Sequence, residues 1–186
     1  DVYQPERRNS RGLHLADGGV LVALAERMER ASRRPWLARP VGSGQEPDGP
    51  AEPIRNPANS VEVVGTVRTA TAEHVAAAID AAARSQPRWN DAGAAHRAAV
   101  LDRAADLFDA YVKRAGPVDL GGSGKTVPDS IAEVREAVDF LRYYAARARV
   151  DFGSPIRLPG PTGESNEISL HGRGVFACIS PWNFPL

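Results

Sequence analysis

The apolar residues of this chain recur every three to four positions over four stretches, and this period predicts four helices. We expect these helices at 19–31, 72–84, 94–113 and 130–150. The side chains expected to cap three of them are Asp17, Thr71, and the Ser-x-x-Glu capping box of Ser130 and Glu133. Pro87 is expected to end the second helix, because a proline inside a helix removes a backbone hydrogen bond. Trp89 would then pack over the end of that helix.

Other hydrophobic patterns predict strands. Residues 61–67 alternate between apolar and polar positions and, together with Ile54, predict a short hairpin at the surface. Residues 166–170 alternate in the same way and predict an antiparallel strand. Residues 175–179 form an unbroken β-branched and aromatic run, which predicts a strand buried on both faces, as in a parallel sheet. Pro181 ends this run, because proline cannot donate a ladder hydrogen bond.

Two stretches lack such a pattern. Residues 1–12 are polar and rich in arginine, and we expect a tail or the end of a linker. Residues 39–53 are rich in proline and glycine and indicate an irregular connector.

The charge and cysteine content narrow the function classes. Of the 186 residues, 23 are basic and 23 are acidic, so the formal net charge is zero. A neutral, interleaved surface has no field to attract nucleic acid or an acidic membrane. No stretch has the length of a membrane span, and the histidines have no metal-ligand spacing. The single cysteine indicates a reducing compartment, which we expect to be the cytoplasm.

Residues 121–126, Gly-Gly-Ser-Gly-Lys-Thr, suggest a phosphate-binding loop of the P-loop type. The motif requires a first glycine at the position of Asp119, whose carboxylate would repel a phosphate. No apolar strand precedes the loop, and Pro128 follows it almost at once. This interpretation is therefore disfavoured, and it would require ATP binding that depends on Lys125.

The sequence Pro181-Trp182-Asn183-Phe184-Pro185 follows the predicted buried strand. Ligands of open α/β sheets bind at the carboxyl ends of such strands. The side-chain amide of Asn183 is a donor that could stabilise an oxyanion there. The alternative interpretation is that Asn183 is only a turn residue.

These residues resemble the Pro-Trp-Asn-Phe-Pro segment of the NAD-dependent aldehyde dehydrogenase superfamily. Residues 133–145 and 158–164 resemble the glutamate-γ-semialdehyde (pyrroline-5-carboxylate) dehydrogenase half of the bifunctional proline-utilisation flavoenzymes. The resemblance implies an α/β fold, the N-terminal part of the aldehyde dehydrogenase fold. It would be mostly helical, with a short hairpin and the first strand of an incomplete Rossmann-like parallel sheet. Residues 1–53 would form an N-terminal tail, helix and linker, and residues 54–186 the start of the NAD-binding domain.

The resemblance also implies roles for single residues. Asn183 would be the oxyanion donor. The residues expected to contact NAD are Ile179, Ser180, Pro181, Trp182 and Asn183. Phe184 would pack on the aliphatic part of the substrate, unless it is only a core residue. Glu136 would lie near the amino group of the substrate, unless it forms a surface ion pair.

The implied parent reaction is the NAD-dependent oxidation of glutamate γ-semialdehyde, a small-molecule aldehyde, to glutamate in proline catabolism. The parent enzyme is expected to be a homo-oligomer. Cys178 lies inside the apolar run, so we expect it to be buried and not to be the nucleophile. The catalytic cysteine and general-base glutamate of the family are expected further along, so this chain is predicted to be an inactive piece of a longer protein with an incomplete NAD site. The alternatives are a truncated product or interaction fragment without activity, and an aldehyde dehydrogenase of another substrate class.

Overall fold

The computed structural model describes residues 2–34, 36–42, 50–115, 124–181, 183–184 and 186. Within this part of the chain, the helices are α1 (Gly18–Ser32), α2 (Ala72–Asp91), α3 (Gly93–Ala115) and α4 (Val127–Asp151). The strands are β1 (Trp36–Ala38), β2 (Glu52–Asn56), β3 (Asn59–Val67), β4 (Ile156–Leu158) and β5 (Asn166–Ile168). The predicted class, mostly helical with a short hairpin and a small incomplete sheet, is confirmed.

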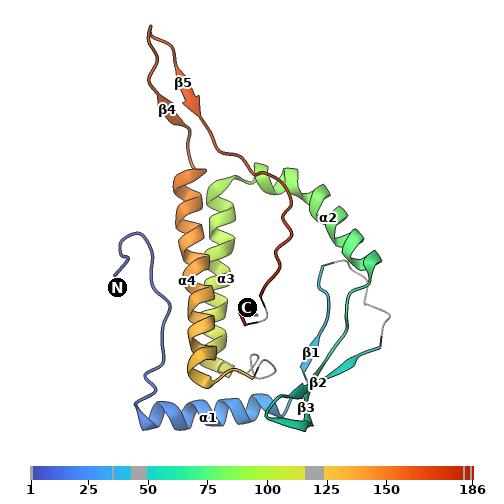
Figure 1. Cartoon of the computed structure of the whole chain (residues 1–186). Helices are drawn as coiled ribbons and strands as arrows, with labels where there is room; N and C mark the ends of the chain where they lie inside the picture. The colour runs from blue at the N-terminus through green and yellow to red at the C-terminus, as the bar shows by residue number, and fades with distance from the viewer. Residues whose placement is uncertain (1, 35, 43–49, 116–123, 182, 185) are drawn as a thin grey trace.

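Helices α3 and α4 run antiparallel, side by side, and form the centre of the molecule (Figure 1). The core between them consists of the buried residues Ala105, Val134 and Val138, with Phe108, Val112 and Leu141 packed around. Helix α1 crosses below this pair, α2 arches away from it, and the β4–β5 hairpin projects beyond the end of α4. The helices predicted at 94–113 and 130–150 therefore supply this core.

The first sheet has the order β1-β3-β2. Strands β2 and β3 pair antiparallel, which confirms the predicted hairpin. Strand β1 was not predicted, and it pairs parallel to β3 with Trp36 opposite Gly65. A Cβ atom at Gly65 would lie 2.8 Å from the carbonyl oxygen of Trp36, so the two strands approach this closely only because position 65 has no side chain.

The helix ends agree with the sequence only in part. Asp17 accepts hydrogen bonds from two amides of α1, and Thr71 accepts one from His74 of α2, as predicted. The predicted capping box at Ser130 and Glu133 is wrong, because Thr126 caps α4 one turn earlier. Both box residues lie buried inside the helix.

Pro87 does not end α2, which continues to Asp91. Helix α2 has no buried residue, so water can satisfy the carbonyl group that loses its amide partner. Trp89 therefore lies within α2 rather than beyond it. Its ring meets that of His96 in α3 edge-on, with 6.1 Å between ring centroids.

Residues 7–10, within the predicted N-terminal tail, lie along α4. The backbone amide and the hydroxyl group of Ser10 donate to Asp139 at 2.7 and 2.8 Å. The guanidinium group of Arg142 donates to the carbonyl oxygen of Asn9 at 3.2 Å. A polar segment is ordered here because α4 offers it hydrogen-bond partners.

The predicted strand at 175–179 is also wrong for this structure. The predicted strand at 166–170 does form, as β5, which pairs antiparallel with β4. No strand is assigned to residues 169–181, and Phe176 and Ile179 are 71% and 93% exposed. Cys178 is exposed as well, not buried as predicted. A strand requires a neighbour for its ladder hydrogen bonds, and no described segment pairs with these residues.

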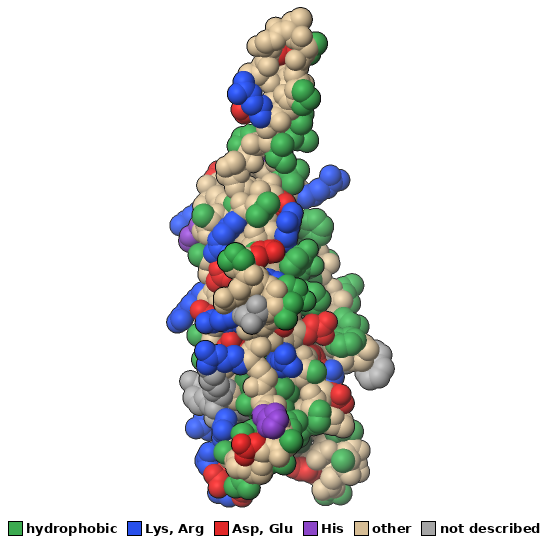
Figure 2. Space-filling model, turned by 90° about the vertical axis from the view of Figure 1, so that its left-hand side faces the viewer, with side chains coloured by type: hydrophobic (Ala, Val, Ile, Leu, Met, Phe, Trp, Pro, Cys, Tyr) green, Lys and Arg blue, Asp and Glu red, His purple; other side chains and the backbone are tan. Residues whose placement is uncertain are grey.

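No helix in the described ranges is long and apolar enough to cross a membrane. Basic and acidic side chains interleave over the face shown in Figure 2. That distribution agrees with the neutral net charge.

Candidate functional site

The candidate site lies where residues 174–186, which we call the C-terminal segment, run back from the β4–β5 hairpin towards the first half of α4 (Figure 1). The backbone amide of Leu186 donates to Oε1 of Glu133 at 2.9 Å. This hydrogen bond ties the end of the segment to α4.

A turn holds Asn183 in this segment. The amide of Phe184 donates to the carbonyl oxygen of Pro181 at 3.0 Å, which closes the turn around Asn183. Asn183 is exposed, so its side-chain amide is accessible. The turn interpretation of Asn183 therefore holds at the level of the backbone, and it is compatible with a role as a donor.

A cavity of about 230 Å³ lies between α4 and the C-terminal segment. It combines apolar walls with two carboxylates. The residues that line it are Glu133, Glu136, Ala137, Phe140, Pro181, Phe184 and Leu186. The carboxylate of Glu133 is already engaged by Lys125 and by the amide of Leu186, so only that of Glu136 can bind a positively charged group of a short aliphatic ligand.

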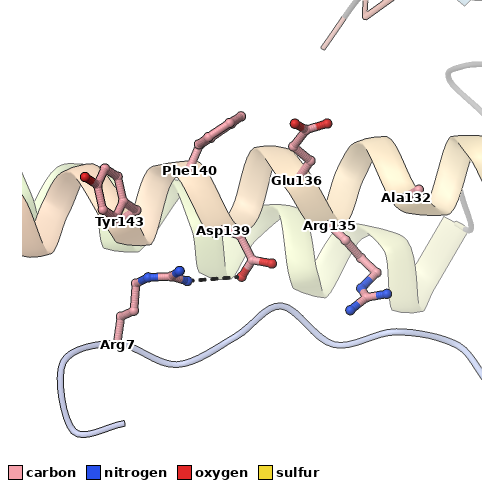
Figure 3. A pocket seen from close by; sticks show the side chains of 7 residues that line it. All are labelled: Arg7, Ala132, Arg135, Glu136, Asp139, Phe140 and Tyr143. Atoms are coloured by element: carbon pink, nitrogen blue, oxygen red, sulfur yellow. Dashed lines mark ion pairs between the residues drawn. The ribbon is translucent and has the colours of Figure 1, made fainter. Parts of the chain in front are cut away.

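A second cavity, of about 470 Å³, lies between α4 and the N-terminal residues (Figure 3). Its lining residues are Arg7, Ala132, Arg135, Glu136, Asp139, Phe140 and Tyr143. None of them belongs to the C-terminal segment. We therefore take the smaller cavity, which Phe184 lines, as the candidate site.

Glu136 and Phe140 line both cavities. Figure 3 shows their side chains pointing away from the N-terminal residues, whereas Arg135 and Asp139 lie on the side of those residues. Glu136 is exposed and forms no hydrogen bond or ion pair with any described residue. The surface ion pair considered for Glu136 is thus not observed, and its carboxylate is available to a ligand.

The guanidinium group of Arg7 is already engaged in the larger cavity. It lies 3.8 Å from a carboxylate oxygen of Asp139 and 3.8 Å from the centroid of the Tyr3 ring. These contacts compete with any anionic ligand for the positive charge of Arg7.

Lys125 and Glu133 are site residues whose role the sequence did not predict. Their side chains form an ion pair and are only 16% and 3% exposed. The Nζ atom of Lys125 also lies 5.0 Å from the centroid of the Phe184 ring. The available sequence signal was Lys125 in the Gly-Lys-Thr triplet. This triplet did not indicate that Lys125 pairs with Glu133, because the sequence pattern assigned Glu133 to a helix cap.

The residues predicted for the site come together in part. The candidate cavity is lined by Pro181, Phe184 and Glu136. The residues next to Pro181 and Phe184 in the sequence are exposed: Ile179, Ser180 and Asn183. Trp182 lies outside the described residues, as do 116–123 with the proposed phosphate loop. The roles predicted for these residues stay predictions, as does the domain boundary after residue 53. The described residues contain no group of three side chains suited to a metal ion.

Comparison with known proteins places this geometry in context. Residues 45–186 match the model of the aldehyde dehydrogenase family. The chain is 38% identical over 186 residues to the bifunctional protein PutA of Escherichia coli K12. This match covers 100% of this chain and 13% of that protein. The chain is 36% identical over 129 residues to the 1-pyrroline-5-carboxylate dehydrogenase of Bacillus licheniformis, covering 69% of this chain and 25% of that protein.

Among solved structures, proline utilization A (PutA) from Bdellovibrio bacteriovorus matches this chain with a TM-score of 0.89 and 29% sequence identity. The match covers 99% of this chain and 19% of that chain. The present chain thus spans a quarter or less of the length of these relatives.

Proposed function

Because the chain belongs to the aldehyde dehydrogenase family, we propose that it supplies part of the active site of an enzyme of proline catabolism. The reaction is the NAD-dependent oxidation of glutamate γ-semialdehyde to glutamate. The similarity to PutA and to a 1-pyrroline-5-carboxylate dehydrogenase supports this substrate class. The structural observation that carries the proposal is the exposed Asn183, in a turn beside a cavity lined by Glu136 and Phe184.

Each of these side chains has a chemical task. The amide of Asn183 donates to the carbonyl oxygen of the aldehyde as negative charge develops on it during nucleophilic attack. The ring of Phe184 packs on the aliphatic chain of the substrate. The carboxylate of Glu136 attracts the positively charged amino group of glutamate γ-semialdehyde.

We assign residues 179–183 to the binding of one side of NAD. When bound, NAD would supply the acceptor for the hydride of the substrate carbon. Ile179 and Ser180 are exposed and belong to no strand. Their apolar surface and backbone carbonyl groups are therefore accessible to the nicotinamide ring of NAD. The N-terminus of α4 is a poor site for the pyrophosphate, because Asp129 lies in its first turn. We assign Trp182 and Asn183 to the same side of NAD.

Two further assignments belong to this proposal. The first is the location: the single cysteine is compatible with the reducing cytoplasm.

The second is a homo-oligomer. The β4–β5 hairpin projects from the molecule and exposes the apolar side chains of Ile156, Leu158 and Ile168, which a second copy of the protein could cover.

The substrate class can be tested with the complete gene product that contains this sequence. We expect NADH formation with kcat/KM highest for glutamate γ-semialdehyde, compared with an aldehyde of the same length that lacks the amino group. The change Glu136→Gln should reduce this preference about 10-fold, because it removes the charge that binds the amino group. Glu29→Gln, at an exposed ion pair of α1, serves as the matched control.

Two results would count against the proposal. Equal kcat/KM for both aldehydes would show an aldehyde dehydrogenase of another substrate class. A complete gene product that forms no NADH with any aldehyde would leave the interaction fragment as the better interpretation.

The 186-residue chain by itself is expected to show no NAD-dependent aldehyde oxidation. Its only cysteine, Cys178, lies in the run assigned to the cofactor edge, so no thiol is assigned to attack the substrate. The measurement is NADH absorbance with the isolated chain at high concentration. Turnover that disappears in Cys178→Ser would contradict this prediction and make Cys178 the nucleophile.

A further inference from the structure

The triplet Gly124-Lys125-Thr126 has no role in the function proposed above. Gly124 has a φ of +71°, and a Cβ atom there would lie 2.7 Å from Cγ of Pro57. The hydroxyl group of Thr126 accepts a hydrogen bond from the amide of Asp129 at 3.3 Å. The first and third residues therefore build the turn and the cap that start α4, and they hold Lys125 at this helix end.

Glu133, one and a half turns into α4, has a side chain that is only 3% exposed. A carboxylate buried to this extent is unfavourable unless each oxygen has a partner. Oε2 is paired with Nζ of Lys125, and Oε1 accepts the hydrogen bond from the amide of Leu186. The two oxygens of Glu133 thus connect the start of α4 to the C-terminal segment.

Lys125 adds a second connection to the same segment. Its ammonium group faces the ring of Phe184 at 5.0 Å, within the range of a cation–π interaction. Phe184 also closes the turn with Pro181. The segment is therefore held at Phe184 and at Leu186, directly after the exposed Asn183.

Before Asn183, the nearest hydrogen bond from the described backbone to another segment is that of the Gly172 amide, which donates to Oδ1 of Asn90 at 2.8 Å. Residues 169–181 are in no strand, and Ile179 is 93% exposed. The placement of Asn183 thus depends on the contacts that follow it. An oxyanion donor must be held within about 0.5 Å of its productive position to be effective.

We propose that Lys125 and Glu133 are positioning residues that hold the C-terminal segment against α4 and so place the amide of Asn183 for oxyanion binding. This inference rests on the proposed function, because it needs an oxyanion for Asn183 to bind. Lys125 and Glu133 contact each other and residues 184 and 186, so we assign both an effect that acts through Asn183. The competing interpretation is that the buried pair only stabilises the fold.

The test uses the complete gene product and the changes Lys125→Met and Asn183→Ala, singly and together. Lys125→Met should lower kcat about 10- to 100-fold, the effect typical of a small misplacement of a catalytic group. In the Asn183→Ala background, Lys125→Met should lower kcat less than about twofold further, because the amide it positions is already absent. Glu29→Gln is again the matched control.

A second variant and a second measurement protect the test against misfolding. Lys125→Met leaves the Glu133 carboxylate buried without its cation, whereas Lys125→Met with Glu133→Gln removes both charges and keeps an acceptor for the amide of Leu186. This pair of changes should restore the melting temperature but not the full kcat. Hydrogen exchange of the Leu186 amide should be about 10-fold faster in Lys125→Met than in the unchanged protein.

The outcomes separate the inference from the function it rests on. If the unchanged protein oxidises the aldehyde and the effects of Lys125→Met and Asn183→Ala on kcat simply multiply, the positioning role is overturned and the function stands. If no aldehyde is oxidised, the proposed function is overturned, and with it the catalytic consequence. Leu186 exchange that does not change in Lys125→Met overturns the contact to the segment in either case.

Discussion

Replacing Asn183 with alanine in the complete enzyme is expected to lower kcat about 100- to 1,000-fold, the usual effect of losing one oxyanion donor. The structure supports the change as a test because Asn183 is exposed and its turn is closed by backbone atoms of Pro181 and Phe184. Removing the side chain therefore deletes the donor and leaves the turn intact. The measurement is steady-state kinetics with glutamate γ-semialdehyde at saturating NAD.

A matched control for this change is Asn166→Ala, which alters an exposed asparagine in β5, away from the C-terminal segment. We expect its kcat to stay within about twofold of the unchanged enzyme, since surface changes rarely disturb a fold. A loss of less than threefold in Asn183→Ala would assign Asn183 to the turn alone. The cofactor and substrate roles of its neighbours would then also lose their support.

Replacing Arg142 with methionine is expected to lower the free energy of unfolding by about 3–5 kcal/mol, the typical result of removing one partner from a buried ion pair. The side chain of Arg142 is 5% exposed and donates to Asp109 at 2.7 Å and to Asp106 at 3.1 Å. It also donates to the carbonyl oxygen of Asn9, so it joins α3, α4 and the N-terminal residues. Without it, the carboxylate of Asp109, 14% exposed, loses the cation paired with it.

The control for Arg142→Met is Arg149→Met. Arg149 pairs with Asp102 at 2.6 Å, but the two side chains are 45% and 40% exposed. An exposed pair of this kind contributes about 0–1 kcal/mol. Urea unfolding followed by circular dichroism compares the two variants. Equal losses of stability would show that burial of the Arg142 cluster has no special effect.

The contribution of Arg142 should not depend on pH in the ordinary range. Burial by itself lowers the pKa of Arg142, but the hydrogen bonds and charges of Asp109 and Asp106 outweigh it and raise the pKa above its usual value. A cation with a raised pKa stabilises the fold fully below its unfolded pKa and loses this contribution only as the pH rises through the folded value. Both pKa values lie far above neutral pH. The stability difference between Arg142→Met and the unchanged protein should therefore remain constant near neutral pH.

The sequence by itself determined the elements whose signals are local. The apolar period predicted α1, α3 and α4, and the side chains of Asp17 and Thr71 predicted two helix starts. These signals are readable because the interacting groups lie within four residues of each other. The resemblance of residues 174–186 to the aldehyde dehydrogenases was readable for the same reason, since its motif is contiguous.

Local signals also caused errors where two interpretations compete within one turn. Ser130 and Glu133 fit a capping box, yet Thr126 lies one turn earlier and supplies the cap. Pro87 was expected to end α2, but an exposed helix tolerates the missing hydrogen bond. In both cases the decision depends on burial, which a single sequence does not state.

Only the tertiary structure decided the roles of the buried polar residues. Glu133 and Arg142 are charged, and both are buried because charged or polar groups from other segments surround them. Ser10 is ordered by Asp139, 129 positions away in the sequence. The run 175–179, conversely, has the composition of a buried strand but no described neighbour to pair with. Burial of a charge, and the formation of a strand, require partners that come from distant parts of the chain, so no local pattern can specify them.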